Sequence, residues 1–408
     1  MVNRRMVPEI RFLGFNDPWE QRKLNSLCEI FSDGDWIESK DQSSKGIRLV
    51  QTGNVGITEF LDKPDNKKWI SDETFKRLNC KEIYAGDILI SRLPEPAGRA
   101  CIVPKINEIM ITAVDCTIAR IAKEFSNKFL VQYLSSSEYF GKVNTLLAGG
   151  TRQRISRTIL GEFEISIPTI IEEQELIGVF LGELDNLITL HQRKLEKLKT
   201  FKKAMLDKMF PKNGEHVPEI RFSGFTDPWE QRKLGDVAQY RNGKAHENCI
   251  DENGKYIVVN SKFISTDGEA KKFSNKKNEV LFENEIAFVL SDVPNGRAIA
   301  RTFLVEKSDK YTLNQRIAGI TPIGETFPYF LYILMNRHPY FLTFDDGVKQ
   351  TNLSVSDVMR FEAYYPKHSE QRKIGIYFKQ LDNLITLHQR KLEKLQNIKK
   401  SMLNKMFI

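Results

Sequence analysis

The sequence predicts an α+β fold, with two tandem mixed α/β domains separated by two long antiparallel coiled-coil helices in a pseudo-twofold arrangement. Three observations support this prediction. The 17-residue segment 8–24 returns at 218–234 with fifteen identical positions. The 38-residue stretch 173–210, whose apolar residues stand alternately four and three apart, returns at 370–407. Between these repeats the two halves diverge, yet short matching elements recur in the same order, so the chain is a duplicated domain-plus-helix unit.

Composition excludes several classes of protein. At 408 residues the chain has room for two to four domains, and its 41% hydrophobic content is sufficient for packed cores. It has no run of eighteen apolar residues, so we expect no membrane contact. The five scattered cysteines form no Cys-x-x-Cys pair and fit reduced thiols in a cytoplasmic protein. The net charge of +8 favours an anionic partner, with nucleic acid the first candidate.

The repeated segment near the start of each half contains an Asp-Pro-Trp-Glu string, at 17–20 and again at 227–230. Asp is a good helix N-cap and Pro suits the first helical position, so the string predicts a short capped helix. We expect Trp19 and Trp229 to anchor the hydrophobic core of their halves.

The divergent regions, roughly 25–172 and 235–369, are predicted to be β-rich. Short apolar runs bounded by Gly, Pro, Asn and Asp are typical of strands, and the clearest cover 87–91, 111–114, 117–121, 285–290 and 317–320. Helices are predicted over 127–147 and 328–342. A skeleton persists through the divergence: Gly98-Arg99-Ala100 matches Gly296-Arg297-Ala298, and Gly150-Thr151-Arg152-Gln153 matches Gly347-Val348-Lys349-Gln350.

The long helices carry a heptad seam that continues for more than four heptads in each copy. This spacing is that of a coiled coil, and the obvious partner of each helix is the other one. A pseudo-twofold relation between the halves requires the helices to run antiparallel. The residues expected to pair the helices lie in fifteen identical positions, and they are Leu184, Ile188, His191, Leu195 and Leu198 with Leu381, Ile385, His388, Leu392 and Leu395. We interpret the two seam histidines as polar residues that set the register, and Lys202 and Lys399 interrupt the seam at matching places.

A search for catalytic motifs finds none. An adenine methyltransferase needs an Asn/Asp-Pro-Pro-aromatic loop, and the nearest string, His338-Pro339-Tyr340, lacks the amide and one proline. Neither a Gly-x-Gly cofactor loop nor a phosphate-binding Gly-x4-Gly-Lys-Ser/Thr loop is present, and the six histidines show no metal-ligand spacing. We therefore expect no catalytic residue, no metal and no cofactor in this chain.

The glycine-containing loops before residues 155 and 353 carry the side chains suited to reading DNA bases. Glycine permits close backbone approach, and Arg, Lys, Gln, Asn and Thr can bond to base edges. For any one residue an ordinary solvated turn is an equally good explanation, but the recurrence of the loop with altered side chains favours DNA contact. The candidates are Thr151, Arg152, Gln153, Arg154, Lys349, Gln350, Thr351 and Asn352, with Arg92, Arg99 and Arg297 as weaker ones.

These features together resemble a known family. A variable domain that closes with Gly-x-x-Gln, Ser, Pro and Glu-Gln, followed by a Leu-rich helix ending in Leu-x-x-Met-Phe, occurs twice and is similar to the specificity subunit of type I restriction–modification systems. The resemblance implies target-recognition domain 1 at 1–172, a central spacer helix at 173–210, target-recognition domain 2 at 211–369 and a C-terminal spacer helix at 370–408. Each target-recognition domain would read one half of a bipartite site on double-stranded DNA.

The resemblance also implies partners. The spacer helices would dock two methyltransferase subunits, restriction subunits would join through them, and the S-adenosylmethionine for adenine methylation would be held by the methyltransferase. An alternative from another class is a non-enzymatic coiled-coil scaffold whose variable domains bind proteins; it predicts no salt-dependent affinity for DNA. An enzyme with a degenerate active site is a third possibility, which the missing motifs disfavour.

Overall fold

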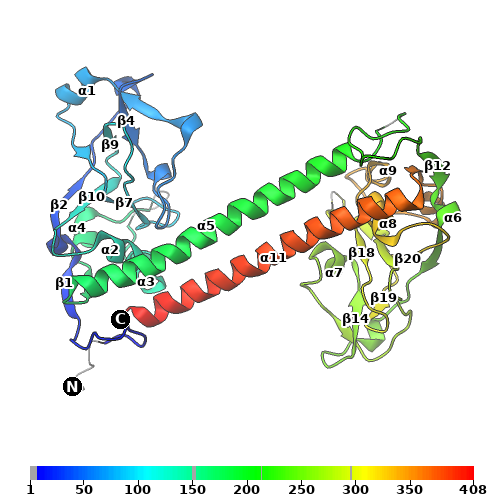
Figure 1. Ribbon diagram of the computed structural model, residues 1–408. Coiled ribbons are helices and arrows are strands. Elements are labelled where there is room, and N and C mark those ends of the chain that lie inside the picture. The colour runs from blue at the N-terminus through cyan, green and yellow to red at the C-terminus, as the bar shows by residue number, and fades with distance from the viewer. Residues whose placement is uncertain (1–6, 149–152, 213, 295) are drawn as a thin grey trace. The chain divides into compact units, whose positions relative to one another are not determined.

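The computed structural model describes residues 7–148, 153–212, 214–294 and 296–408. The chain divides into two compact units: unit 1 combines Met1–Lys194 with His388–Ile408, and unit 2 is Leu195–Leu387. Each unit therefore contains a mixed α/β domain, the first part of the long helix that follows this domain, and the last part of the other long helix (Figure 1). The two units are described separately below.

Unit 1 is built on two larger sheets and one strand pair. The four-stranded antiparallel sheet has the order β2-β10-β7-β8, the five-stranded sheet has the order β3-β5-β4-β9-β6, and β1 pairs with β11. Within the five-stranded sheet, β4 and β9 are parallel. The strands are β1 (Glu20–Lys23), β2 (Cys28–Asp33), β3 (Gln42–Ser43), β4 (Ile47–Val50), β5 (Lys68–Ile70), β6 (Glu82–Ile83), β7 (Ile88–Ser91), β8 (Ala100–Ile102), β9 (Met110–Thr112), β10 (Cys116–Ile121) and β11 (Glu164–Ile167).

Unit 2 repeats this plan. Its four-stranded sheet, β13-β20-β16-β18, has the same order of equivalent strands, and its second sheet, β15-β14-β19, again holds a parallel pair, β14 with β19. Two further pairs are β12 with β22 and β17 with β21. The strands are β12 (Glu230–Lys233), β13 (Ala238–Asn242), β14 (Tyr256–Val259), β15 (Phe273–Ser274), β16 (Ile286–Val289), β17 (Ser291–Asp292), β18 (Thr302–Leu304), β19 (Tyr311–Leu313), β20 (Ile317–Pro322), β21 (Thr351–Asn352) and β22 (Glu362–Tyr365).

The helices also recur in pairs. Besides single 3-10 turns, they are α1 (Asp72–Arg77), α2 (Asn127–Tyr133), α3 (Ser137–Thr145), α4 (Arg157–Gly161), α5 (Ile171–Lys208), α6 (Leu234–Val237), α7 (Ser261–Ser265), α8 (Pro328–Met335), α9 (Pro339–Leu342), α10 (Val355–Met359) and α11 (His368–Met406). The 3-10 turns are η1 (Leu24–Leu27), η2 (Ser39–Asp41), η3 (Thr52–Asn54), η4 (Pro64–Asn66) and η5 (Glu247–Cys249). The long helices α5 and α11 each begin two residues before the repeated 38-residue stretches at 173–210 and 370–407.

Three expectations about local structure were wrong. The Asp-Pro-Trp-Glu strings form no helix: Glu20 and Glu230 begin strands β1 and β12, which pair with β11 and β22. The capping signal is local, and the strand pairing that buries the adjacent tryptophans overrides it. The helix expected at 127–147 is two helices, because Ser136 starts a new one by accepting a hydrogen bond from the Tyr139 N–H. The helix expected at 328–342 is likewise divided before Pro339.

Other predictions were confirmed. The five apolar runs overlap β7, β9, β10, β16 and β20. Trp19 and Trp229 are 3% and 2% exposed, so both are core residues. The core of unit 1 joins Trp19 to residues of α2 and the early part of α5, together with Met406 and Phe407 at the end of α11. The core of unit 2 joins Trp229 to α8, to the early part of α11, and to Met209 after the end of α5.

Candidate nucleic-acid interface

In unit 1, helix α2 of the domain lies along the first turns of α5 and is attached at successive points. Gln174 accepts a hydrogen bond from the Ser126 N–H (2.9 Å) and donates to the Pro168 carbonyl (2.8 Å). One turn further on, a Cβ added to Gly178 would lie 2.6 Å from the Phe129 nitrogen, so only glycine allows this approach. The Pro and Glu-Gln motif therefore fixes the domain on its helix.

Unit 2 repeats these attachments with α8 on α11. Gln371 accepts from the Phe327 N–H (3.0 Å) and donates to the Pro366 carbonyl (2.9 Å). A Cβ on Gly375 would lie 2.5 Å from the ring of Phe327. The matching glycine and glutamine positions show that both domains meet their helices in the same way.

The repeated segment before each tryptophan connects two helix ends within its unit. In unit 1, Arg11 makes a bidentate pair with the fully buried Glu173 at the start of α5 (2.6 and 2.8 Å). Its neighbour Ile10 donates its N–H to the Lys405 carbonyl near the end of α11 (2.9 Å).

In unit 2 the equivalent Arg221 binds Glu370 at the start of α11 (2.7 and 2.7 Å). Ile220 donates to the Lys208 carbonyl at the end of α5 (2.9 Å). We call residues 8–12 and 218–222 the connector segments.

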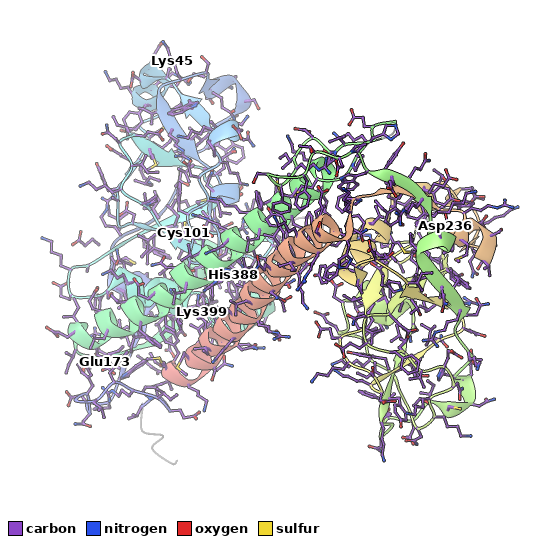
Figure 2. All side chains as sticks on the ribbon, turned by 45° about the vertical axis from the view of Figure 1, so that its right-hand side comes forward. Lys45, Cys101, Glu173, Asp236, His388 and Lys399 are labelled. Atoms are coloured by element: carbon purple, nitrogen blue, oxygen red, sulfur yellow. The ribbon has the colours of Figure 1, made fainter. Side chains whose placement is uncertain are left out.

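The helices run antiparallel in each unit. In unit 1, Asp185 on α5 binds Lys399 on α11, while His191, further along α5, meets His388, which comes earlier on α11 (Figure 2 labels His388 and Lys399). The His191 and His388 Nδ1 atoms are 2.8 Å apart. In unit 2, Lys202 on α5 binds Asp382 on α11 (2.5 Å).

All ten residues expected to pair the helices are buried or half-buried. The expected pairing residues of α5 are Leu184, Ile188, His191, Leu195 and Leu198, and those of α11 are Leu381, Ile385, His388, Leu392 and Leu395. Leu184 and Leu395 belong to the hydrophobic core of unit 1, and Leu198 and Leu381 to that of unit 2.

The loop before β21 in unit 2 is held by hydrogen bonds and presents polar side chains. Asp346 Oδ1 accepts the N–H groups of Lys349 and Val348 (2.9 Å each), which lower the pKa of this carboxyl. Gln350 Nε2 donates to Ser291 Oγ (2.7 Å) on the adjoining β17.

Side chains alternate along this loop and strand. Lys349, Gln350 and Asn352 are exposed, whereas Thr351 is only 5% exposed. The expected DNA contact by Thr351 does not fit this arrangement, because strand alternation turns its side chain inward.

The corresponding loop of unit 1 is described only in part, because Thr151 and Arg152 lie outside the described residues. Gln153 and Arg154 are exposed, and the backbone of Arg154 exchanges two hydrogen bonds with Ala148 (3.0 and 2.8 Å). The N–H of Ile155 then bonds to the Arg92 carbonyl, just as the N–H of Leu353 bonds to Leu290 in unit 2. Both loops thus close on the same strand end of their four-stranded sheet.

The three weaker arginine candidates differ. The guanidinium of Arg99 donates to four backbone carbonyls, those of Val55, Leu93, Pro96 and Thr52, at 2.6–3.0 Å. Arg92 is 7% exposed and donates to the Val114 carbonyl (2.6 Å). These contacts favour structural roles for Arg92 and Arg99 instead of the expected DNA contacts. Arg297, the counterpart of Arg99, is exposed and stays a candidate.

Sequence reasoning missed two recurring features. Asp185 and Asp382 contact the domain and the opposite helix at once; their position next to seam leucines in the identical stretch was the available signal. A Lys-Lys-aromatic string also recurs where β5 and β15 pair with equivalent strands, as 67–69 and 271–273. Lys271 and Lys272 are exposed, whereas Lys67 is half-buried and pairs with Glu108 (2.8 Å).

Two kinds of feature are absent from the part of the chain that the structure describes. No group of three or more His, Cys, Asp or Glu residues there could hold a metal ion. No helix among those residues is long and apolar enough to cross a bilayer.

Comparisons with known proteins agree over nearly the whole chain. Residues 16–200 and 226–397 each match the family of the type I restriction modification DNA specificity domain. A protein of Methanocaldococcus jannaschii named as the MjaX type I restriction enzyme specificity subunit is 22% identical over 95% of this chain and 92% of its own length. The MjaVIII specificity subunit of the same organism is 24% identical over 86% of this chain and 82% of its own.

A solved structure agrees as well. The type I restriction–modification S subunit from M. genitalium has the same fold, with a TM-score of 0.70, 17% identity and 99% coverage of both chains. The two family matches coincide with the duplicated halves, and the named relatives are specificity subunits, as distinct from methyltransferase and restriction subunits. This chain therefore belongs to the family of non-catalytic specificity subunits of type I restriction–modification systems.

Proposed function

We propose that this chain reads a bipartite site on double-stranded DNA, with the domain of each unit recognising one half-site. One observation carries the proposal: the attachments of each domain to its helix match residue by residue, while the loops closing the four-stranded sheets differ in their side chains. Two different half-sites require the same attachment of each domain to its helix but different side chains at the DNA bases, because base contacts specify sequence while phosphate contacts position the protein.

The exposed loop residues are the proposed base contacts. In unit 2 they are Lys349, Gln350 and Asn352, with Arg297 of the Gly-Arg turn as a further candidate, and in unit 1 they are Gln153 and Arg154. Thr151 and Arg152, which lie outside the described residues, are proposed from the sequence alone. Ser291 holds the Gln350 amide nitrogen, which restricts the side chain and leaves its carbonyl oxygen to accept a hydrogen bond from a base. The exposed pair Lys271 and Lys272 of unit 2 is a proposed phosphate contact, because lysine binds phosphate as a point charge independently of sequence.

An exposed apolar stripe that repeats on the long helices supports the proposal of two partner sites. Val179, Leu187 and Leu190 on α5 are 43, 42 and 60% exposed, and their counterparts Ile376, Leu384 and Leu387 on α11 are 40, 43 and 45% exposed. Repeated apolar patches are typical of protein interfaces. We propose that each stripe receives one methyltransferase subunit, so that two bind per chain, and that restriction subunits join through them. S-adenosylmethionine would be bound by the methyltransferase, this chain would hold no cofactor, and the complex would act in the cytoplasm.

Methylome sequencing of cells that express this chain with its methyltransferase tests the proposal. We expect one bipartite motif with two specific halves and a fixed non-specific spacer. Exchanging residues 25–172 for the matching region of another specificity subunit should change one half-site and leave the other intact. A methylome without a bipartite motif, or a change in both half-sites together, would contradict the proposal. The absence of a salt-dependent affinity for DNA would instead favour the protein-binding scaffold.

A further inference from the structure

The two aspartates Asp185 and Asp382, which we call the bridging carboxylates, each contact the opposite long helix and the domain of their unit at once. In unit 1, Asp185 stands on α5, and one of its oxygens binds Lys399 on α11. Its other oxygen, Oδ2, accepts hydrogen bonds from Gln132 Nε2 (2.8 Å) and Thr58 Oγ1 (2.9 Å), both in the domain. A single carboxylate therefore ties together two helices and the domain of unit 1.

Unit 2 contains the same arrangement with a different donor. Asp382 on α11 binds Lys202 on α5 through Oδ1 (2.5 Å) and accepts a hydrogen bond from the Tyr329 hydroxyl through Oδ2 (2.8 Å). Tyr329 is the second residue of α8 (Pro328–Met335), whereas Gln132 is the sixth residue of α2 (Asn127–Tyr133), so the donor of unit 2 comes from a helix position one turn earlier. Burial and the adjacent Asp382 carboxylate raise the pKa of Tyr329, which keeps the hydroxyl protonated as a donor. The contact is thus preserved although the residue that makes it has changed.

These contacts explain the polar interruptions of the heptad seam. A lysine in an apolar seam costs stability, and a Leu at either position would extend the apolar packing. Lys202 is 22% exposed and Lys399 12% exposed at its side chain, so both ammonium groups are largely withdrawn from water. The lysine–aspartate pair recurs in both units despite this cost in stability. This recurrence indicates that the pair fixes the position of the helices and the domain relative to each other within its unit, which apolar contacts alone do poorly.

We propose that Asp185 and Asp382 are positioning residues that set the orientation of each target-recognition domain on the paired helices, and so restrict the complex to one spacer length between the half-sites. The inference rests on the proposed function, since a spacer has meaning only for a bipartite site. Charge-assisted hydrogen bonds suit this task because they are short and directional. In unit 1 the glutamine cap holds the start of α2 and the carboxylate holds Gln132 near its end. In unit 2 the glutamine cap and the carboxylate both hold the start of α8, through Phe327 and Tyr329. In both units the carboxylate therefore gives the domain a further directional attachment to the helices.

The test uses the full chain co-expressed with its methyltransferase on a plasmid library in which the spacer varies by up to two base pairs in either direction. The variants are Asp185→Asn for unit 1 and Tyr329→Phe for unit 2. Matched controls are Glu183→Gln, an exposed carboxylate on the same turn of α5, and Tyr332→Phe, the neighbouring tyrosine on α8. The fraction of methylated sites at each spacer length is read by methylome sequencing, and assembly with the methyltransferase is checked by co-purification.

We expect Asp185→Asn and Tyr329→Phe to keep both half-site sequences but to raise the methylation of sites with a neighbouring spacer about tenfold relative to the native spacer, as the loss of one hydrogen bond to a charged group allows. The controls should match the wild type. An unchanged profile, an equal loss at every spacer, or a changed half-site sequence would each overturn the inference. If Asp185→Asn fails to assemble, Tyr329→Phe decides, because it removes one hydroxyl and keeps the ring. A wild-type chain that yields no bipartite motif would instead refute the proposed function.

Discussion

The histidine pair in the seam of unit 1 predicts that acid weakens the pairing of α5 and α11. The two rings have their centroids 5.0 Å apart and their Nδ1 atoms 2.8 Å apart, so one nitrogen donates and the other accepts. One extra proton can be accommodated, because an imidazolium still donates to a neutral ring. A second proton places two N–H groups against each other and breaks the hydrogen bond.

The geometry gives the size of the effect. Two unit charges 5.0 Å apart repel by about 1 kcal/mol at the dielectric constant of water and by about 3 kcal/mol at an effective value of about 20. The lost hydrogen bond adds about 1 kcal/mol. His388 is only 7% exposed, whereas His191 is half-buried, so the repulsion should lie between these limits.

The direction of the pH dependence follows from the pKa of His388. Burial lowers this pKa, and so do the charges of His191 and of Lys194 and Lys391, which lie on α5 and α11. An unfolded histidine has a pKa of about 6.5, so unfolding takes up protons below that pH. The stabilising contribution is therefore fully present above about pH 6.5 and is lost as the pH falls through the lowered pKa of the folded state.

Urea unfolding of the purified chain between pH 8 and pH 5, followed by far-UV circular dichroism, measures this contribution. We compare the wild type with a His191→Leu/His388→Leu double variant, and with His216→Asn as a surface control. Burial also lowers the pKa of His338, to about 4, but His338 is present in every variant and cancels in the difference. The wild type should lose about 2–4 kcal/mol more than the double variant on acidification, which is the sum of the charge repulsion and the lost hydrogen bond. Equal losses in the two proteins would refute the reasoning.

Three further predictions concern the connector, the loops and the helices. Glu173→Gln should lower the free energy of unfolding in urea by about 3–5 kcal/mol, because it leaves Arg11 as an unpaired buried charge. Glu172→Gln on the exposed face should change it little. Equal effects of the two variants would contradict this account. Gln153→Ala or Gln350→Ala should relax discrimination in its own half-site, with about 1–3 kcal/mol at stake for a bidentate base contact, and an unchanged methylated motif would assign these residues a structural role. One heptad added at equivalent points of both helices should lengthen them by about 10 Å and the DNA spacer by about three base pairs. An active complex that keeps its original spacer would show that the helices do not set the distance between the half-sites.

Periodic and repeated features made most of the fold predictable. The heptad spacing identified α5 and α11 because a seam of this kind has no use in a strand. Apolar runs bounded by Gly, Pro, Asn and Asp identified the central strands of the four-stranded sheets, because such runs are typical of buried strands. The Asp-Pro-Trp-Glu string misled because a cap is a local preference of about 1 kcal/mol, which the pairing of β1 with β11 and the burial of Trp19 exceed.

The candidate site was less predictable because hydrogen-bond partners distant in sequence decide what a polar residue does. Arg99 and Arg297 occupy matching Gly-Arg turns, yet the first is held by four carbonyls while the second is exposed. Thr351 stands in a promising loop but on the inward side of a strand. The position of Asp185 beside a seam leucine was a signal, but it did not identify its partners, which come from residues 58, 132 and 399.

The bridging carboxylates show how the domains could diverge without losing their placement. Gln132 and Tyr329 share neither shape nor polarity, yet each brings one donor to the Oδ2 atom of an equivalent aspartate. The aspartate therefore requires a hydrogen-bond donor at one position and no particular residue type. The sequence of the surrounding domain can change as long as a donor atom occupies that position. Contacts of the backbone with Gln174 and Gln371 impose even less on sequence, because any residue offers an N–H. Because the long helices hold each domain through single atoms and backbone groups, the sequences of the loops can change without altering these attachments. New half-sites can then arise while the spacer between them stays the same.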